Sequence, residues 1–142
     1  MAKAVGVFVF NGYQELEFWY PVLRLREAGL PVTVIGIEND QTAYSLLGYP
    51  VVPNVALAKT SPGDFAALVL PGGKLGAVAD HPVLRRFLSE AGDQNVILAG
   101  ISQGGELMPA DASGGATGKT IVARTSDDLP KLSRTLLEAL RT

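Results

Sequence analysis

The sequence predicts an α/β domain, built as a three-layer α/β/α sandwich around a mainly parallel sheet. Short, nearly continuous runs of β-branched and other apolar residues recur along the 142 residues, which is typical of strands buried on both faces. Segments with apolar residues at helical spacing separate most of these runs, and this alternation favours parallel strands with helices on both faces. The length suits one domain and we find no internal repeat, so residues 1–142 are expected to form a single unit.

The N-terminal half accounts for three core strands, one helix and one excursion from the sheet. Their expected ranges are a strand over 4–10, a helix over 14–28 that ends at Gly29, a strand over 32–37, a hairpin over 42–57 and a strand over 65–70. Pro21 lies inside the helical segment and predicts either a kink in the first turns or a late helix start. Pro50 and Pro53 keep the hairpin away from the centre of the sheet.

The C-terminal half continues the alternation. The expected elements are a helix over 80–91, a strand over 95–101, a strand over 120–124 and a helix over 128–140. Pro82 occupies the first turn of the first of these helices and Gly92 is expected to follow its end. Pro109 limits the helix after the strand at 95–101 to about two turns. The small residues of 110–118 indicate a loop.

Composition excludes several classes of function. Hydrophobic residues make up 47% of the chain and charged residues 18%, as in globular proteins, and the net charge is −2. An evenly spread charge of this size predicts neither a nucleic-acid surface nor a membrane anchor. The chain has no cysteine, which removes disulfides, thiolate metal sites and thiol catalysis. The apolar run near the N-terminus is too short for a signal-peptide core, so we expect a cytoplasmic protein.

Three segments should meet beyond the carboxyl ends of the strands, where open parallel sheets bind ligands. These segments are 11–17, 71–74 and 101–105. The third contains Gly100-Ile101-Ser102-Gln103-Gly104, which fits the Gly-x-Ser-x-Gly elbow that exposes a nucleophile after a strand. The alternative is a tight turn that happens to contain a serine.

Five further segments, together with the elbow, carry a resemblance to the ThiJ/PfpI family. The chain is similar to its intracellular-protease and deglycase branch, within the class I glutamine-amidotransferase-like superfamily. The similarity covers nearly the whole chain in the same order, and it implies a flavodoxin-like fold. The segments that carry it are 10–17, 20–29, 48–51, 64–73 and 127–130.

The resemblance implies a set of site residues and two departures from the family pattern. The elbow cysteine of the family corresponds to Ser102, and the histidine that usually follows it corresponds to Gln103. The glutamate that contacts the thiol corresponds to Glu17. Backbone amides of the Pro-Gly-Gly turn, at Gly72 and Gly73, together with that of Gln103, would bind an oxyanion. An acidic residue that some members carry shortly after this turn has no counterpart here.

Two hypotheses of different class follow from these departures. The first is a degenerate member that keeps the family pocket, lacks thiol-dependent protease or deglycase activity and acts as a small-molecule-binding or stress-related module. The second is an enzyme in which Ser102, with Glu17 as its carboxylate partner, supports hydrolase or hydratase chemistry. Residues 76–77 and 80–82 resemble the isonitrile-hydratase-like branch and belong to this second hypothesis. A serine engineered in place of cysteine is a third explanation.

The missing base favours the first hypothesis, because a serine hydroxyl is a weak nucleophile until a base takes its proton. The only histidine, His81, stands at the expected start of a helix and is expected to lie outside the site, unless another subunit supplies it. Residues 113–120 nearly spell a phosphate-binding loop but lack its first glycine and its strand-to-helix context, so we interpret them as a loop.

The expected partner is a small-molecule ligand, with no metal ion, no cofactor, no nucleic acid and no membrane. We also expect a homo-oligomer, with a dimer as the first choice. Charge is scarce, and the segment after Ser102 is shorter than in the family, which leaves sheet surface to be covered. The last helix also carries leucines at helical spacing, namely Leu132, Leu136, Leu137 and Leu140.

Overall fold

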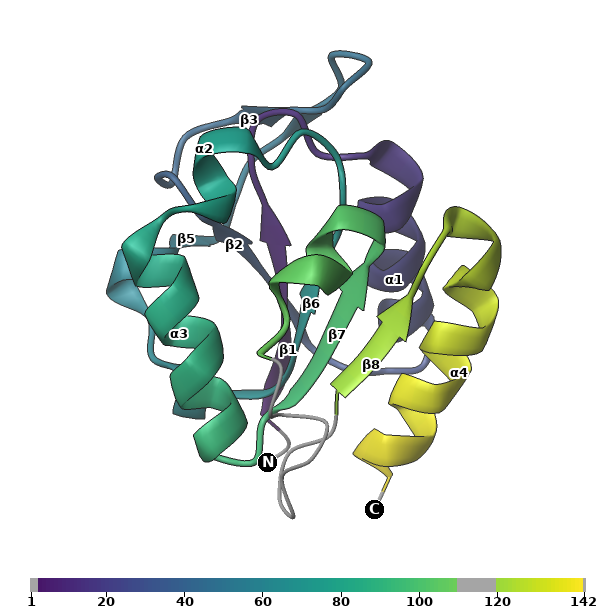
Figure 1. Cartoon of the computed structure of the whole chain (residues 1–142). Coiled ribbons are helices and arrows are strands. Elements are labelled where there is room, and N and C mark those ends of the chain that lie inside the picture. The colour runs from purple at the N-terminus through teal and green to yellow at the C-terminus, as the bar shows by residue number, and fades with distance from the viewer. Residues whose placement is uncertain (1–2, 110–119, 142) are drawn as a thin grey trace.

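The computed structural model describes residues 3–109 and 120–141, and its centre is a six-stranded sheet (Figure 1). All five pairings between neighbouring strands are parallel. The α/β fold class expected from the sequence is therefore confirmed. In spatial order the strands are β5 (Val55–Ala56), β2 (Val32–Gly36), β1 (Ala4–Val9), β6 (Phe65–Leu70), β7 (Ile97–Ile101) and β8 (Thr120–Ala123).

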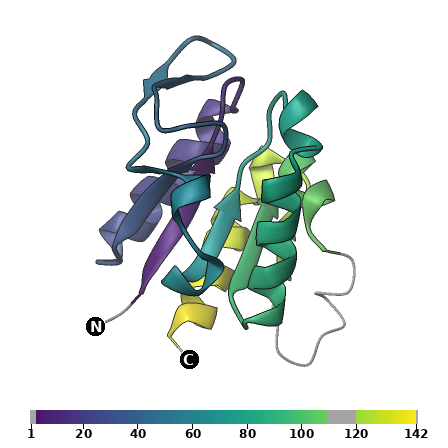
Figure 2. The same ribbon diagram turned by 90° about the vertical axis from the view of Figure 1, so that its left-hand side faces the viewer.

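Helices cover both faces of the sheet, as Figure 2 shows with α1 and α3 on opposite sides. Helix α1 (Glu15–Glu27) packs against α4 (Leu129–Leu140), while α3 (Pro82–Asp93) contacts β7 from the other face. The short α2 (Gly76–Ala79) precedes α3. Because both α3 and α4 contact β7, the inner strands are buried on both sides, which explains their unbroken apolar sequence. The described residues also form four short 3₁₀ helices: η1 (Leu57–Lys59), η2 (Pro62–Asp64), η3 (Ser102–Leu107) and η4 (Ser126–Asp128).

Two helix boundaries differ from the sequence prediction. Helix α1 begins at Glu15, one residue after the expected start, and the Gln14 side chain caps the Glu17 amide at 2.7 Å. Pro21 therefore lies within the helix, and of the two alternatives for this proline the late start is wrong. Helix α3 continues through Gly92 to Asp93. The left-handed turn that follows is made by Asn95, with φ of 64°, because asparagine tolerates this conformation better than most residues.

The excursion over 42–57 divides into two parts. Strands β3 (Ala43–Tyr44) and β4 (Pro50–Val51) pair antiparallel as the expected hairpin, outside the main sheet. The following strand, β5, instead joins the main sheet as its edge beside β2. Asn54 makes this possible, because its side chain accepts a hydrogen bond from the Val34 amide at 2.7 Å and its own amide donates to the Val34 carbonyl.

The strand order places a topological switch point in the middle of the sheet. From β1 the chain first runs to β2 on one side and later returns to β6 on the other. Open α/β sheets bind ligands at such a point, beyond the carboxyl ends of the strands. The residues that follow β1, β6, β7 and β8 therefore meet at one edge of the sheet.

Candidate functional site

The strained turn predicted by the Gly-x-Ser-x-Gly motif is present directly after β7. Ser102 adopts φ of 51°, in the left-handed region that non-glycine residues seldom occupy. Both flanking glycines are required by close approach of the backbone. A Cβ at Gly100 would lie 2.6 Å from the Gly105 Cα, and one at Gly104 would overlap the Leu70 carbonyl oxygen. The turn thus holds the Ser102 side chain at the edge of the sheet.

Glu17 joins the ends of four segments through its carboxylate, and 4% of the residue is exposed. The Ser102 hydroxyl donates to Oε2 at 2.8 Å, which is the contact expected from the sequence. The Ser126 hydroxyl donates to the same oxygen at 3.0 Å, and the Gly72 amide donates to Oε1 at 2.9 Å. Three donors compensate the cost of removing a carboxylate from water.

The two amides of the Pro-Gly-Gly turn already have acceptors. The Gly72 amide is bound to Glu17, and a Cβ at this position would lie 2.6 Å from Glu17 Oε1, so only glycine fits. The Gly73 amide donates to Gln103 Oε1 at 3.2 Å. Because the Gln103 side chain is exposed, it can rotate away and free the Gly73 amide. The oxyanion role of these amides stays a prediction.

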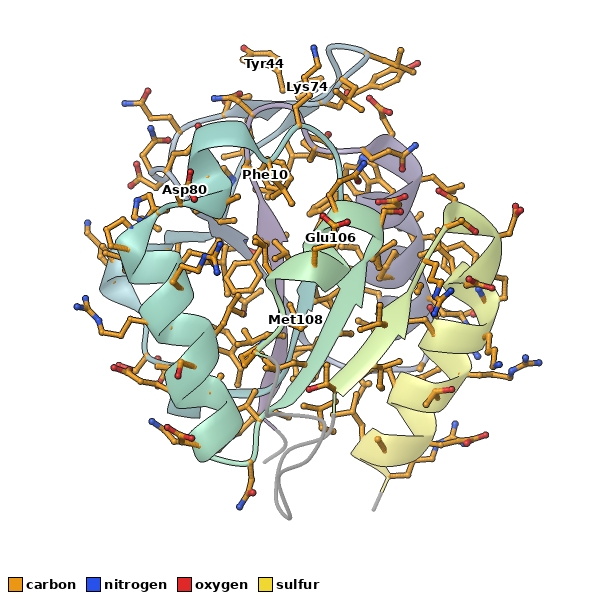
Figure 3. The ribbon with its side chains drawn as sticks, in the orientation of Figure 1. Phe10, Tyr44, Lys74, Asp80, Glu106 and Met108 are labelled. Carbon is orange, nitrogen blue, oxygen red and sulfur yellow. The ribbon has the colours of Figure 1, made fainter. Side chains whose placement is uncertain are left out.

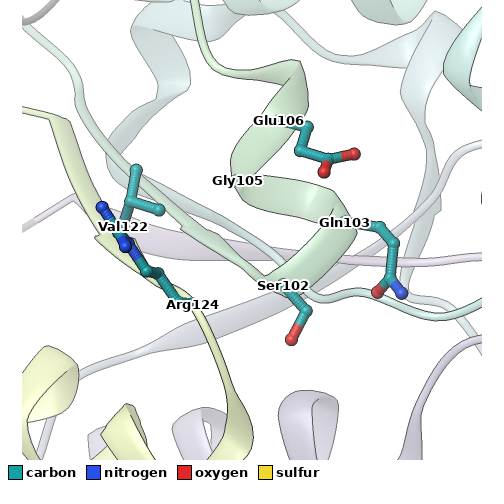
Figure 4. Close-up of a pocket in the computed structure, with 6 residues that line it drawn as sticks. All are labelled: Ser102, Gln103, Gly105, Glu106, Val122 and Arg124. Carbon is teal, nitrogen blue, oxygen red and sulfur yellow. The ribbon is translucent and has the colours of Figure 1, made fainter.

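A pocket of about 420 Å³ opens beside the elbow, between η3 and β8 (Figure 4). Glu106 of η3 lies at its rim and is also visible in front of the sheet in Figure 3. Of the predicted site residues, Ser102 and Gln103 line this pocket, whereas Glu17 is buried behind it. The full lining consists of Ser102, Gln103, Gly105, Glu106, Val122 and Arg124.

Sequence reasoning missed Ser126 and Arg124. Both follow β8 within three residues, and β8 ends at the same edge of the sheet as β7. The rule that selected the segments after the other strands therefore also applies to residues 124–126. Neither residue was considered, because no motif marks this position.

His81 takes no part in the network around Glu17. It is the residue preceding α3, and no hydrogen bond connects it to Ser102 or Glu17 in the described part of the chain. Its Nδ1 atom is buried without a hydrogen-bond partner there. The stretch that resembles a phosphate-binding loop lies outside the described residues, except for Thr120 at the start of β8.

Tyr13 and Glu15 connect the site to the β3–β4 hairpin. The Tyr13 backbone bridges to Gly73, and its buried ring carries a hydroxyl that donates to the Tyr49 carbonyl at 3.0 Å. Burial raises the pKa of the Tyr13 phenol. Burial also acts to raise the pKa of Glu15, but hydrogen bonds from the Ser45 hydroxyl and from the Leu47 amide, at 2.7 Å, outweigh it and lower that pKa.

The described residues contain neither a candidate metal site nor a helix that could span a membrane. Residues 3–109 and 120–141 contain no group of three or more His, Cys, Asp or Glu side chains that could hold a metal ion. Within the same ranges no helix has the length and apolar character needed to cross a bilayer.

About half of this chain's length is similar in sequence to curated proteins. An uncharacterized protein of Archaeoglobus fulgidus is 39% identical over 70 residues, which are 49% of this chain and 41% of that protein. Protein dj-1beta of Drosophila melanogaster is 33% identical over 79 residues, 56% of this chain and 42% of the relative. The aligned part of the chain thus spans about two fifths of the length of these curated relatives.

Solved structures share the whole fold. The crystal structure of the VC2308 protein covers 99% of this chain and 87% of its own, with 21% identity and a TM-score of 0.85. That of Drosophila melanogaster DJ-1beta covers 99% and 91%, with 20% identity and a TM-score of 0.82. The family model described as DJ-1/PfpI matches residues 3–129. The chain therefore belongs to the DJ-1/PfpI family.

Proposed function

We propose that this chain is a degenerate DJ-1/PfpI protein that binds a small molecule in the family pocket and lacks thiol-dependent protease or deglycase activity. The observation that carries the proposal is the state of the elbow. Its side chain is the Ser102 hydroxyl, whose proton is donated to Glu17, and the chain contains no cysteine. A stress-related role follows from the resemblance alone and belongs to the same proposal.

The surroundings of Ser102 favour an inert hydroxyl. A serine becomes a nucleophile when a base accepts its proton and a third group orients that base. Among residues 3–109 and 120–141 the only acceptor bound to the Ser102 side chain is Glu17, which also accepts bonds from Ser126 and Gly72. These donors occupy both carboxylate oxygens, so Glu17 is held by the folded chain and is not reserved for Ser102. The neighbouring Gln103 carries a neutral carboxamide that cannot take up the proton.

Labelling with a fluorophosphonate probe at neutral pH tests the proposal. We expect no adduct on the native protein by intact mass spectrometry, and none on the Ser102→Ala variant. Stoichiometric labelling of the native protein that disappears in Ser102→Ala would overturn the proposal. A protease with an activated serine serves as the positive control for the probe.

The competing function is a serine-based hydrolase or an isonitrile-hydratase-like enzyme that uses Ser102 with Glu17. One observation favours it: the hydroxyl donates to the carboxylate at 2.8 Å, which is the direction in which a general base would remove the proton. The labelling experiment separates the two functions. Catalysis by this pair requires a reactive serine, whereas a binding module requires none.

Ser102→Cys provides a second test of the elbow. A thiol at this position lies at the N-terminal end of η3, where backbone amides lower the pKa of a thiol, so the variant should be oxidised by dilute peroxide. The measurement is the mass gain after peroxide treatment. The Ser126→Cys variant is the matched control, because Ser126 is half-buried like Ser102 and also donates to Glu17 but lies outside the elbow.

We further propose a cytoplasmic homodimer. In the described residues, all but one of the large apolar side chains that remain exposed lie on α1 or on the hairpin segment, and the exception is Val122. The Leu47 amide is bound to Glu15, so the two apolar regions are neighbours.

Light scattering tests the dimer. It should give the mass of a dimer for the native protein, and Leu47→Asp should shift this mass toward that of a monomer. A monomeric native protein would overturn the proposal. The exposed apolar side chains of α1 and the hairpin segment, which would form the dimer interface, are Leu16, Leu23, Tyr44, Leu46, Leu47, Tyr49 and Val52.

A further inference from the structure

The pocket beside the elbow has the size and position of a small-molecule site. Its volume of about 420 Å³ lies within the range of ligand-binding pockets. It opens at the carboxyl ends of β7 and β8, where this class of fold binds ligands. One flank is η3 and the other is formed by Val122 and Arg124 of the β8 segment (Figure 4).

Two other arginines, Arg24 and Arg85, have hydrogen-bond partners within the chain, whereas the Arg124 guanidinium has none in the described residues. Arg24 is paired with Glu27, and Arg85 donates to the Ala79 carbonyl at 2.8 Å. Arg124 lines the pocket and has neither a hydrogen bond nor an ion pair with any residue in 3–109 or 120–141. Its planar guanidinium is therefore available to an external acceptor, and a carboxylate matches its paired donors.

The acidic groups around Arg124 do not neutralise it. Glu17 is buried and its carboxylate is bound by three donors of the chain. Glu106 lines the same pocket, but Figure 4 shows its side chain directed away from Arg124. Asp128 and Lys131 line an adjacent hollow together with Arg124, and no ion pair connects Asp128 to the guanidinium in the described part of the chain. The negative charge of Asp128 and the positive charge of Lys131 offset one another.

The remaining lining favours an organic molecule with a single negative charge. Val122 is half exposed and lies beside Arg124, so it offers apolar surface next to the cation (Figure 4). One arginine balances one carboxylate. A phosphate dianion would bring more negative charge close to Glu106 and Glu17 than this single cation can balance.

We propose that Arg124 makes the pocket specific for small organic carboxylates. The carboxylate lies on the guanidinium, and a short apolar chain packs on Val122 and Gly105. This inference rests on the proposed function, in that it assigns a ligand class to the same pocket.

Titration with butanoate, followed by backbone amide NMR, tests the inference. We expect saturable shifts at the amides of residues 102–106 and 122–124, and no comparable shifts with butanamide, which has the same shape without the charge. Arg124→Gln should weaken butanoate binding by about tenfold or more, as loss of a charge-assisted contact predicts. Arg134→Gln, an exposed position on α4 outside the pocket, should leave binding unchanged.

The inference would be overturned by equal binding of butanoate and butanamide, by unchanged binding in Arg124→Gln, or by tighter binding of inorganic phosphate. Absence of saturation in the millimolar range would do the same. These results do not bear on the loss of catalytic activity, because that part of the proposed function is tested by the labelling of Ser102. If Ser102 is not labelled and butanoate does not bind, the proposal of a degenerate family member is retained, and only the assignment of carboxylates as its ligands is wrong.

Discussion

The site has a buried half and an open half, which differ in whether the chain itself supplies hydrogen-bond partners for their polar groups. In the buried half, the Glu17 carboxylate is bound by Ser102, Ser126 and Gly72, all from the chain itself. In the open half, Arg124 lines a pocket without a partner in the described residues. A ligand that entered the buried half would have to break existing hydrogen bonds, whereas one that binds Arg124 would not. The residues that hold the buried half together are therefore distinct from the arginine that we propose as the ligand-binding residue.

Loss of the buried carboxylate should have the largest effect on stability. Glu17→Leu leaves the buried Gly72 amide and the two serine hydroxyls without an acceptor, and hydrogen bonds to a charged group contribute about 1.5–3 kcal/mol each. We expect a loss of about 3 kcal/mol or more in the free energy of unfolding, measured by urea denaturation. Glu27→Leu on the exposed side of the same helix should cost less than about 1 kcal/mol. Similar losses for the two variants would contradict a structural role of Glu17.

A smaller effect is expected at Ser126. Ser126→Ala removes one of the two hydroxyl donors to Glu17 Oε2, so we expect a loss of about 1 kcal/mol in the same denaturation experiment. Ser133→Ala is the matched control, because the Ser133 hydroxyl is buried without a hydrogen-bond partner in the described residues. Its removal should be neutral or stabilising. If Ser126→Ala also leaves the free energy of unfolding unchanged, the hydrogen bond from Ser126 to Glu17 does not stabilise the fold.

The folded protein should also lose stability at alkaline pH, through Tyr13, which connects the site to the hairpin. Burial raises the pKa of Tyr13 above its usual value of 10.0, so the folded protein retains this proton longer than the unfolded chain. Its contribution is complete below pH 10 and is lost as the pH rises through the folded pKa. The fall in melting temperature above pH 10 should be shallower in Tyr13→Phe. The lowered pKa of Glu15 acts in the opposite range, where stability is lost as the pH falls below about 4.5.

The smallest effect on stability is expected in the open half. Arg124→Gln removes an exposed guanidinium that has no partner in the described residues, so the free energy of unfolding should change by less than about 0.5 kcal/mol. Urea denaturation of this variant beside Glu17→Leu tests the separation of the two halves directly. A loss comparable to that of Glu17→Leu would show that Arg124 also has a structural role.

The sequence alone predicted the fold class and much of the buried half. The unbroken apolar runs of β1, β6 and β7 predict buried parallel strands, because a strand covered on both faces cannot carry polar residues. The elbow pattern predicted the strained turn at Ser102, and the family resemblance predicted its contact with Glu17. These features depend on local chemistry or on a pattern along the chain, so they can be read before the chain is folded.

Only the tertiary structure decided the remaining partners of the site. Ser126 and Glu17 are 109 residues apart, and their contact depends on β8 lying beside β7 at the sheet edge. The occupation of the Gly73 amide by Gln103, and the place of Arg124 in the pocket without a partner in the described residues, depend on the same packing. A serine or an arginine has no periodicity that shows what it will face. Apolar burial determines where the strands run, and strand order then determines which polar side chains meet.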